Sequence, residues 1–165
     1  MRSVVEYSLS GIDAAGAAYI IAAHLKVSPH PATIQLAQLS GRAILRRHGP
    51  APERTVTGHW RRTGTLVTED GIVAAHTMLS WDPGALPAEV RGELDAGTRP
   101  AGLILAGLPG FARLFRTGLA SGARVDATAE LYVGGVRVGH SAETVTEELC
   151  EAAAAFWAAN PNGGY

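Results

Sequence analysis

The sequence predicts an α+β domain, with an antiparallel sheet and helices gathered on one side of it. Two pairs of strand-like segments are each joined by a tight-turn signal, Glu69-Asp70-Gly71 in one pair and Gly134-Gly135 in the other. Segments of helix-forming composition lie before, between and after these pairs. The whole chain, 1–165, is expected to form a single domain, because its length suits one sizeable core.

The first part of the chain contains two predicted helices and one strand. Residues 12–26 have helix-forming composition, with Asp13 near the start. Residues 30–41 form a second, short helix whose apolar residues recur at three- and four-residue spacing, and Gly41 ends it. The segment from residue 42 to 48, RAILRRH, then reads as a strand before a Pro/Gly-rich loop.

The middle of the chain opens with the first predicted hairpin, whose strands cover residues 59–68 and 72–81. A polar helix follows at 87–97. Residues 98–110 read as a turn, an apolar run and another turn. The segment FARLFRTGLASG, residues 111–122, looks like a short helix that ends at glycine.

The last part of the chain holds the second hairpin and a terminal helix. Residues 124–133 alternate well enough for a strand, and VRVGHSAETV pairs back after the Gly-Gly turn. The Ala-rich segment 147–159 carries three glutamates, which favours an amphipathic helix of a soluble protein over a membrane span.

Composition excludes several classes of function. A net charge of -1 offers no basic field for nucleic acid or a membrane surface. The single cysteine, Cys150, excludes an internal disulfide and any multi-cysteine zinc site, so we expect a reducing, cytoplasmic setting. The N-terminal residues lack the pattern of a signal peptide, and no apolar run is long enough to span a membrane. We expect a monomer or a homodimer.

No common catalytic or cofactor motif is present. The six histidines never fall in HxxxH or HxH spacing, so no metal site is predicted. Phosphate-binding GxGxxG and GxxxxGK[ST] motifs are absent, and Ser121 lacks the context of a nucleophile elbow. Cys150 lies beside glutamates, which would raise the pKa of its thiol. No cofactor is expected.

An arginine pair on the first hairpin is the main candidate for ligand binding. On a regular strand, Arg62 would share one face with Gly64 and Leu66, and Arg61 would point to the other face. A buried arginine is costly without an anion partner, which can be a carboxylate side chain or a bound ligand. One of the two arginines can therefore reach into the interior and hold an anion.

Glu143 on the last strand is the candidate carboxylate. If that strand is regular and its valines face the core, Glu143 lies on the solvent side with Arg137 and Ser141. By that parity alone, Glu143 would be exposed.

The order of four segments resembles the chorismate lyase (chorismate–pyruvate lyase) family. They are the short helix and strand HPATIQLAQLSG and RAILRRH, the hairpin RRTGTLVTEDGIVAAHTMLSW, the turn LDAGTRPAGLIL, and the final hairpin ELYVGGVRVGHSAETV. The third segment is the most specific, because it is similar to the family signature L-x-x-G-x-x-P-L-G-x-x-L. The resemblance covers residues 28–146.

The resemblance implies a six-stranded antiparallel sheet with helices on one side and a ligand cavity closed by helix-turn-helix flaps. It implies a small carboxylate substrate and elimination of pyruvate from chorismate to give 4-hydroxybenzoate, without a cofactor. Arg62 would grip the substrate carboxylate and Glu143 would assist proton movement. Further substrate-binding candidates are Ala32, Ala101, Gly102, His76 and His140.

Three departures from the family pattern leave the substrate open. Glu143 lies about one residue off the family register, so a bulge would have to turn it inward. Ala101 stands where the family usually has leucine, and the helix at 147–159 extends beyond compact family members. The alternatives are a secondary-metabolite cyclase or eliminating enzyme acting on a polyketide-like substrate on the same fold, and a small-molecule-binding module.

Overall fold

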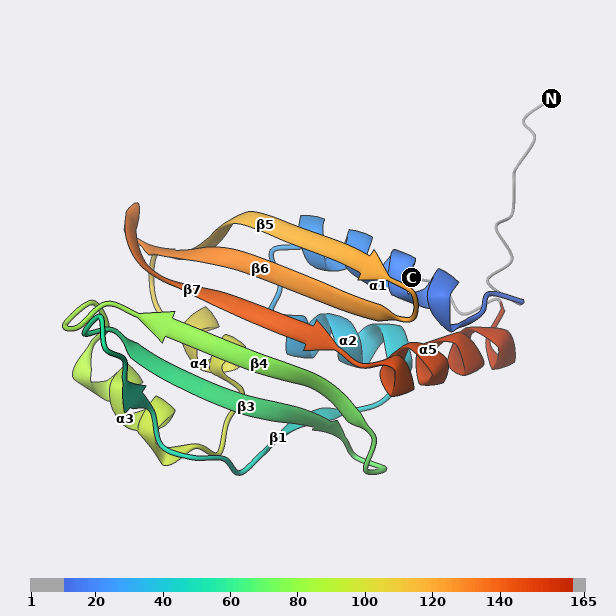
Figure 1. The fold of residues 1–165 in the computed structure, drawn as a ribbon, viewed down its shortest axis with the longest axis horizontal. Helices are drawn as coiled ribbons and strands as arrows, with labels where there is room; N and C mark the ends of the chain where they lie inside the picture. Colours follow the sequence, from blue (N-terminus) through green and yellow to red (C-terminus); the bar gives the residue numbers. More distant parts are fainter. Residues whose placement is uncertain (1–10, 162–165) are drawn as a thin grey trace.

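The computed structural model describes residues 11–161 and folds them into one sheet with five helices (Figure 1). The helices are α1 (Ala14–Val27), α2 (Ala32–Ser40), α3 (Ala88–Ala96), α4 (Ala101–Ala106) and α5 (Glu147–Ala159). The strands are β1 (Ile44–Arg47), β2 (Glu53–Arg54), β3 (Trp60–Thr68), β4 (Val73–Trp81), β5 (Phe111–Ser121), β6 (Arg124–Val133) and β7 (Val136–Val145).

The sheet is open and antiparallel throughout, with the strand order β1-β3-β4-β7-β6-β5 and the two-residue β2 paired to β3 beside β1. The expected α+β class and antiparallel sheet are therefore confirmed, with seven strands in place of about six. Figure 1 shows α1, α2 and α4 behind the strands, so one face of the sheet is covered and the other is open.

The first helix begins at a capped residue and packs tightly against the edge of the sheet. Asp13 Oδ1 accepts a hydrogen bond of 2.8 Å from the Gly16 N–H, which satisfies one free donor of the first turn. The buried residues of α1 include Ala17, Ala18 and Ile21. At Gly118 of β5 the backbones approach so closely that a Cβ would collide with the Ala22 carbonyl oxygen.

The last helix, α5, is part of the core. Its bounds agree with the predicted segment 147–159. Thr146 caps it, because its hydroxyl accepts from the Leu149 N–H at 3.2 Å and donates to the Val73 carbonyl at 2.5 Å. Leu149 and Trp157 are buried in the cluster that α1 and α2 also supply. The helix therefore completes the covered side of the sheet.

Two separate hydrophobic clusters lie on the covered face. The first, here the α5 cluster, joins α1, α2 and α5 to the sheet and contains Leu36, Leu66 and Trp157. The second, here the α3–α4 cluster, contains Leu94 of α3, Leu105 of α4 and Leu131 of β6. The space between them holds the polar residues described below.

One expectation for the segment after α3 is wrong. Residues 111–122, expected as a short helix, form the long strand β5, whose exposure alternates from Arg116 to Ser121. Pairing with β6 over its whole length gives the segment a strand partner, and this tertiary contact outweighs its local preference. The apolar run expected between two turns at 98–110 contains the helix α4.

Within residues 11–161, no helix combines the length and the apolar character needed to cross a bilayer.

Candidate active site

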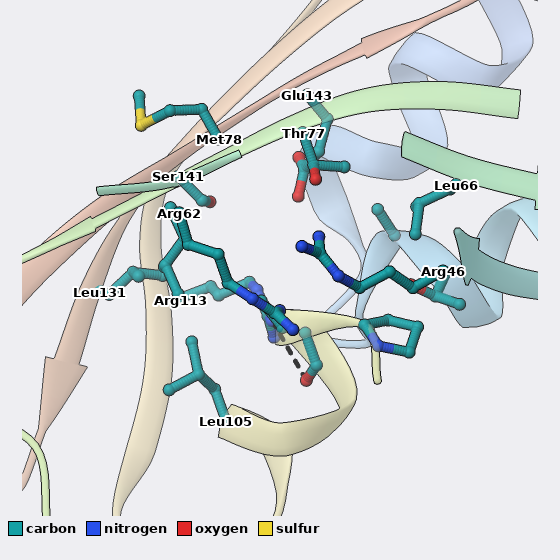
Figure 2. Close-up of a pocket in the computed structure, with 16 residues that line it drawn as sticks. Arg46, Arg62, Leu66, Thr77, Met78, Leu105, Arg113, Leu131, Ser141 and Glu143 are labelled. Atoms are coloured by element: carbon teal, nitrogen blue, oxygen red, sulfur yellow. Dashed lines mark hydrogen bonds between the residues drawn. The ribbon is translucent and has the colours of Figure 1, made fainter. Parts of the chain in front are cut away.

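A cavity lies between the covered face of the sheet and the residues at the start of α2 and α4 (Figure 2). Its charged lining residues are Arg46, Arg62, Arg113 and Glu143. The centre of a water-sized sphere can occupy about 30 Å³ of it, which is room for a few waters at most. Three guanidinium groups thus share a small enclosed space with one carboxylate.

Arg62 is the most deeply buried charged residue of this cavity. Its side chain is 2% exposed, because β3 turns it toward the covered face beside Leu79 of β4. Nη2 donates to the Arg99 carbonyl oxygen at 2.8 Å, whereas Nε and Nη1 are buried without a hydrogen-bond partner. Burial, and secondly the charge of Arg46, lower its pKa to about 10. The predicted burial of Arg62 is confirmed, and two of its nitrogens remain available for an anion.

Arg61 has the opposite environment, as its parity predicts. Its side chain is exposed and forms an ion pair with Glu53 of β2. Such an exposed pair contributes about 0–1 kcal/mol.

Arg46 of β1 enters the cavity through a gap left by Gly64. A Cβ at Gly64 would collide with Arg46 Nη1, so only glycine leaves the guanidinium room at this point. Arg46 Nε donates to the Gly97 carbonyl and Nη2 donates to the Thr63 carbonyl, each at 3.0 Å. These two bonds fix its position beneath the turn that joins α3 to α4.

Arg113 and Arg116 both point to the covered side of the sheet because β5 contains a bulge. Leu114 pairs with Glu130 and Thr117 pairs with Thr128, so two residues of β5 stand opposite one residue of β6. Burial lowers the pKa of Arg113 to about 10, and the negative charge of Glu143 opposes this shift.

The neighbours of these two arginines are backbone carbonyls. Arg113 Nη2 reaches the Gly102 carbonyl at 3.5 Å. Arg116 Nη1 donates to the Ser28 carbonyl in the loop that leads into α2. Neither side chain has a carboxylate within ion-pair distance among the described residues.

Glu143 lines the cavity because β7 also contains a bulge. Leu131 pairs with Gly139 and Tyr132 pairs with Arg137, so Val138 is the extra residue. After it the parity changes, so Ser141 and Glu143 line the cavity on the covered side, whereas Arg137, before the bulge, lies on the open face. The exposed position that regular alternation predicted is therefore wrong, and the inward bulge is observed.

The Glu143 carboxyl is easier to protonate than an ordinary glutamate. Burial raises its pKa above the usual 4.5, and the positive charges of Arg113 and Arg116 oppose that rise. A carboxyl of this kind can hold a proton at a pH where exposed glutamates are ionised, which suits it to donate or accept one.

Three further predicted site residues, Ala32, Ala101 and Gly102, also line the cavity. Ala32 begins α2, and the other two begin α4 after Pro100. The cavity therefore brings together residues from both ends of the predicted segment 28–146.

The two candidate histidines, His76 and His140, do not line this cavity. His76 pairs with Thr65 and lies on the open face, in a shallow depression beside β1. His140 pairs with Ser80 on the same open face. On β4, the alternate residues Thr77 and Leu79 line the cavity, and strand parity turns His76 to the opposite face. The bulge at Val138 does the same for His140.

Sequence reasoning missed Arg46 and Arg113. Arg46 lies in a predicted strand, two residues after Ile44 and therefore on the same face. This shared face with an apolar residue was the available signal. Arg113 lies in the segment expected to be helical, so its orientation toward the sheet was not predicted.

Among residues 11–161, no group of three or more His, Cys, Asp or Glu side chains could hold a metal ion. Cys150 is buried, and burial followed by the charges of Glu147 and Glu151 raises the pKa of its thiol to about 11. The thiol is therefore a poor nucleophile.

No family model matches the chain, and no curated protein sequence matches it closely enough to indicate kinship.

Proposed function

We propose that the protein is a chorismate lyase-like enzyme, which eliminates pyruvate from chorismate to give 4-hydroxybenzoate or a closely related aromatic acid. The observation that carries the proposal is Arg62, whose Nε and Nη1 are buried without partners in the cavity that Glu143 also lines. A buried guanidinium with unused donors is a binding group for a carboxylate, which accepts two parallel hydrogen bonds from it.

The charge of the cavity supports a substrate with two carboxylates. Among the described residues that line the cavity, the charged ones are Arg46, Arg62, Arg113 and Glu143, so positive charge in the lining is in excess by two when that carboxyl is ionised. Chorismate carries two carboxylates, which would balance this excess in a site that excludes water. Electrostatic attraction is strong in such a setting, because the local dielectric constant is low.

The proposed chemistry needs one proton transfer and a fixed orientation. Arg62 holds the ring carboxylate, and Glu143 accepts the proton of the ring carbon that bears the hydroxyl as the ether C–O bond on the neighbouring carbon breaks. The departing enolpyruvate takes up this proton on its methylene carbon and becomes pyruvate. Aromatisation of the ring drives the elimination, so positioning within the cavity supplies most of the catalysis. The proposal requires no cofactor.

A substrate of this size requires the cavity to enlarge. The space of about 30 Å³ is well below that of typical ligand pockets, which measure about 300–1,000 Å³. Pro100, Ala101, Gly102 and Leu105 form one wall of the cavity. We propose that this wall moves outward when substrate enters, as the flaps of the chorismate lyase family would.

The proposal is tested by a coupled assay for pyruvate. Purified protein is mixed with chorismate, and lactate dehydrogenase with NADH reports the release of pyruvate against an authentic lyase. We expect steady NADH oxidation that the variant Arg62→Ala abolishes and Arg61→Ala leaves unchanged. Absence of pyruvate in the presence of an active control lyase would overturn the proposal.

The charged lining favours the lyase over the two alternatives. A polyketide-like substrate for a cyclase would make little use of three guanidinium groups, although Ala101 leaves more room than leucine would. A binding module would be stabilised by aromatic acids in a thermal-shift screen without consuming any of them, which distinguishes it from an enzyme.

A further inference from the structure

The two edges of the sheet differ in length and protection. At one end, β1 has four residues and β2 covers part of the same side of β3. At the other end, β5 has eleven residues and pairs only with β6 (Figure 1). Within residues 11–161, no strand pairs with the outer side of β5, so its backbone N–H and C=O groups are open to a further strand.

The open face of β5 lacks the charges that usually protect a long edge strand. Leu119 is 68% exposed and Phe115 is 73% exposed, and Leu114 is exposed as well. Arg116 turns to the covered side and donates to the Ser28 carbonyl, so it does not shield the edge. From Leu114 to Ser121, no charged side chain points to the open face, and such edges pair readily with other strands.

The bulge in β5 limits where a strand can pair. Phe115 has a φ of +51°, a left-handed conformation that is strained for a bulky residue, and its ring lies 6.3 Å from that of Tyr132. Beyond the bulge, the residues from Thr117 to Ser121 follow β6 in regular register. This five-residue stretch is the usable part of the edge.

We propose that the protein forms a homodimer in which the Thr117–Ser121 stretches of two copies pair antiparallel, joining the two sheets into one. A two-fold axis beside Leu119 places Leu119 against Leu119 of the second copy. It places Thr117 against Ser121, and Gly118 against Ala120. Leucine meets leucine and hydroxyl meets hydroxyl on the open face, and small residues meet on the covered face, with no like charges opposed.

The occupant is a second copy because the stretch complements itself. The exposed side chains alternate as Thr117, Leu119 and Ser121, so reversal of the strand about Leu119 reproduces the same pattern. On the covered face, Gly118 packs closely against Ala22 of α1, and Gly118 and Ala120 carry no large side chain that a facing strand would meet. The surface contact is small, so we expect a dimer that dissociates on dilution.

The proposal is tested by sedimentation velocity of the full chain from about 1 to about 100 µM. We expect the mass to rise to that of a dimer, and amide hydrogen exchange of Thr117–Ser121 to slow as concentration rises. Leu119→Lys should give a monomer at every concentration, because the added charges oppose each other across the axis. Its thermal midpoint should equal that of the wild type at the lowest concentration, where the wild type is also a monomer, because this side chain is exposed.

Leu45→Lys is the matched control, since Leu45 is 55% exposed on β1 at the other edge of the sheet. It should leave the dimer intact. A wild-type protein that stays monomeric over the whole range would overturn the proposal. So would a dimer that survives Leu119→Lys, because its interface would then lie elsewhere.

Discussion

Arg62 of β3 and Glu143 of β7 point into one cavity although β4 separates their strands. Arg62 lies opposite Leu79 of β4, and Leu79 lies opposite Ser141, two residues before Glu143. The carboxylate is thus displaced along the sheet from the guanidinium, and no ion pair between them is present. The two groups keep their separate capacities, one to hold an anion and one to exchange a proton.

Replacement of Arg62 should weaken ligand binding without lowering the stability of the fold. We expect Arg62→Met to weaken binding of 4-hydroxybenzoate by about 30-fold or more, equivalent to about 2 kcal/mol, measured by isothermal titration calorimetry. The thermal midpoint without ligand should be unchanged or higher, because an apolar side chain replaces a buried charge with two unpartnered nitrogens. Arg61→Met is the control and should bind normally.

Glu143 should make the stability of the protein depend on pH. Because its pKa is raised in the folded state, that state retains the proton over a range in which the unfolded chain has released it. The contribution of Glu143 to the free energy of unfolding should therefore be fully present below the usual pKa of 4.5 and be lost as pH rises through the folded-state pKa.

This dependence is measured by urea denaturation between about pH 4 and pH 8. In Glu143→Gln, the free energy of unfolding should no longer decrease through this pH range, and at neutral pH it should be higher than that of the wild type. Glu148→Gln, an exposed residue of α5, should keep the wild-type profile. Equal profiles for Glu143→Gln and the wild type would contradict the burial of this carboxyl.

Gly64→Ala should destabilise the protein through Arg46. The new Cβ would collide with the guanidinium and displace it from its bonds to the Gly97 and Thr63 carbonyls. We expect a loss of about 1–3 kcal/mol in the free energy of unfolding, measured by urea denaturation. Gly92→Ala in α3, where nothing lies within 4 Å, should instead stabilise the protein by about 0.5–1 kcal/mol.

Thr146→Ala should loosen the junction between the sheet and α5. The substitution removes the cap of the helix and the bond to the Val73 carbonyl. We expect a loss of about 1 kcal/mol or more in the free energy of unfolding. Thr146→Ser retains the hydroxyl and should therefore keep most of the wild-type free energy of unfolding. An equal loss in both variants would show that the methyl group, and not the cap, stabilises the junction.

The hairpins were predictable because their turns and alternation are local. The Asp-Gly and Gly-Gly turns connect the expected strands, and the burial of Arg62 and Leu66 follows from the same alternation. The rest of the site depends on two bulges, at Phe115–Arg116 in β5 and at Val138 in β7. Each bulge changes which residues face the helices. The two-residue alternation of a strand sequence does not show where its register with the partner strand will shift. Arg113 and Glu143 could therefore be found only with the partner strands in place.

The division of the covered face into two clusters places the three tryptophans of the protein in two separate surroundings. Trp157 lies in the α5 cluster, whereas Trp81 is buried in the α3–α4 cluster with Trp60 packed against it. Leu66 and Ala32 of the first cluster and Leu79 and Leu105 of the second line the cavity between them. Indole emission from the two sites therefore reports separately on the two clusters, and it shows whether the clusters on either side of the arginine-lined cavity unfold in one step or in two.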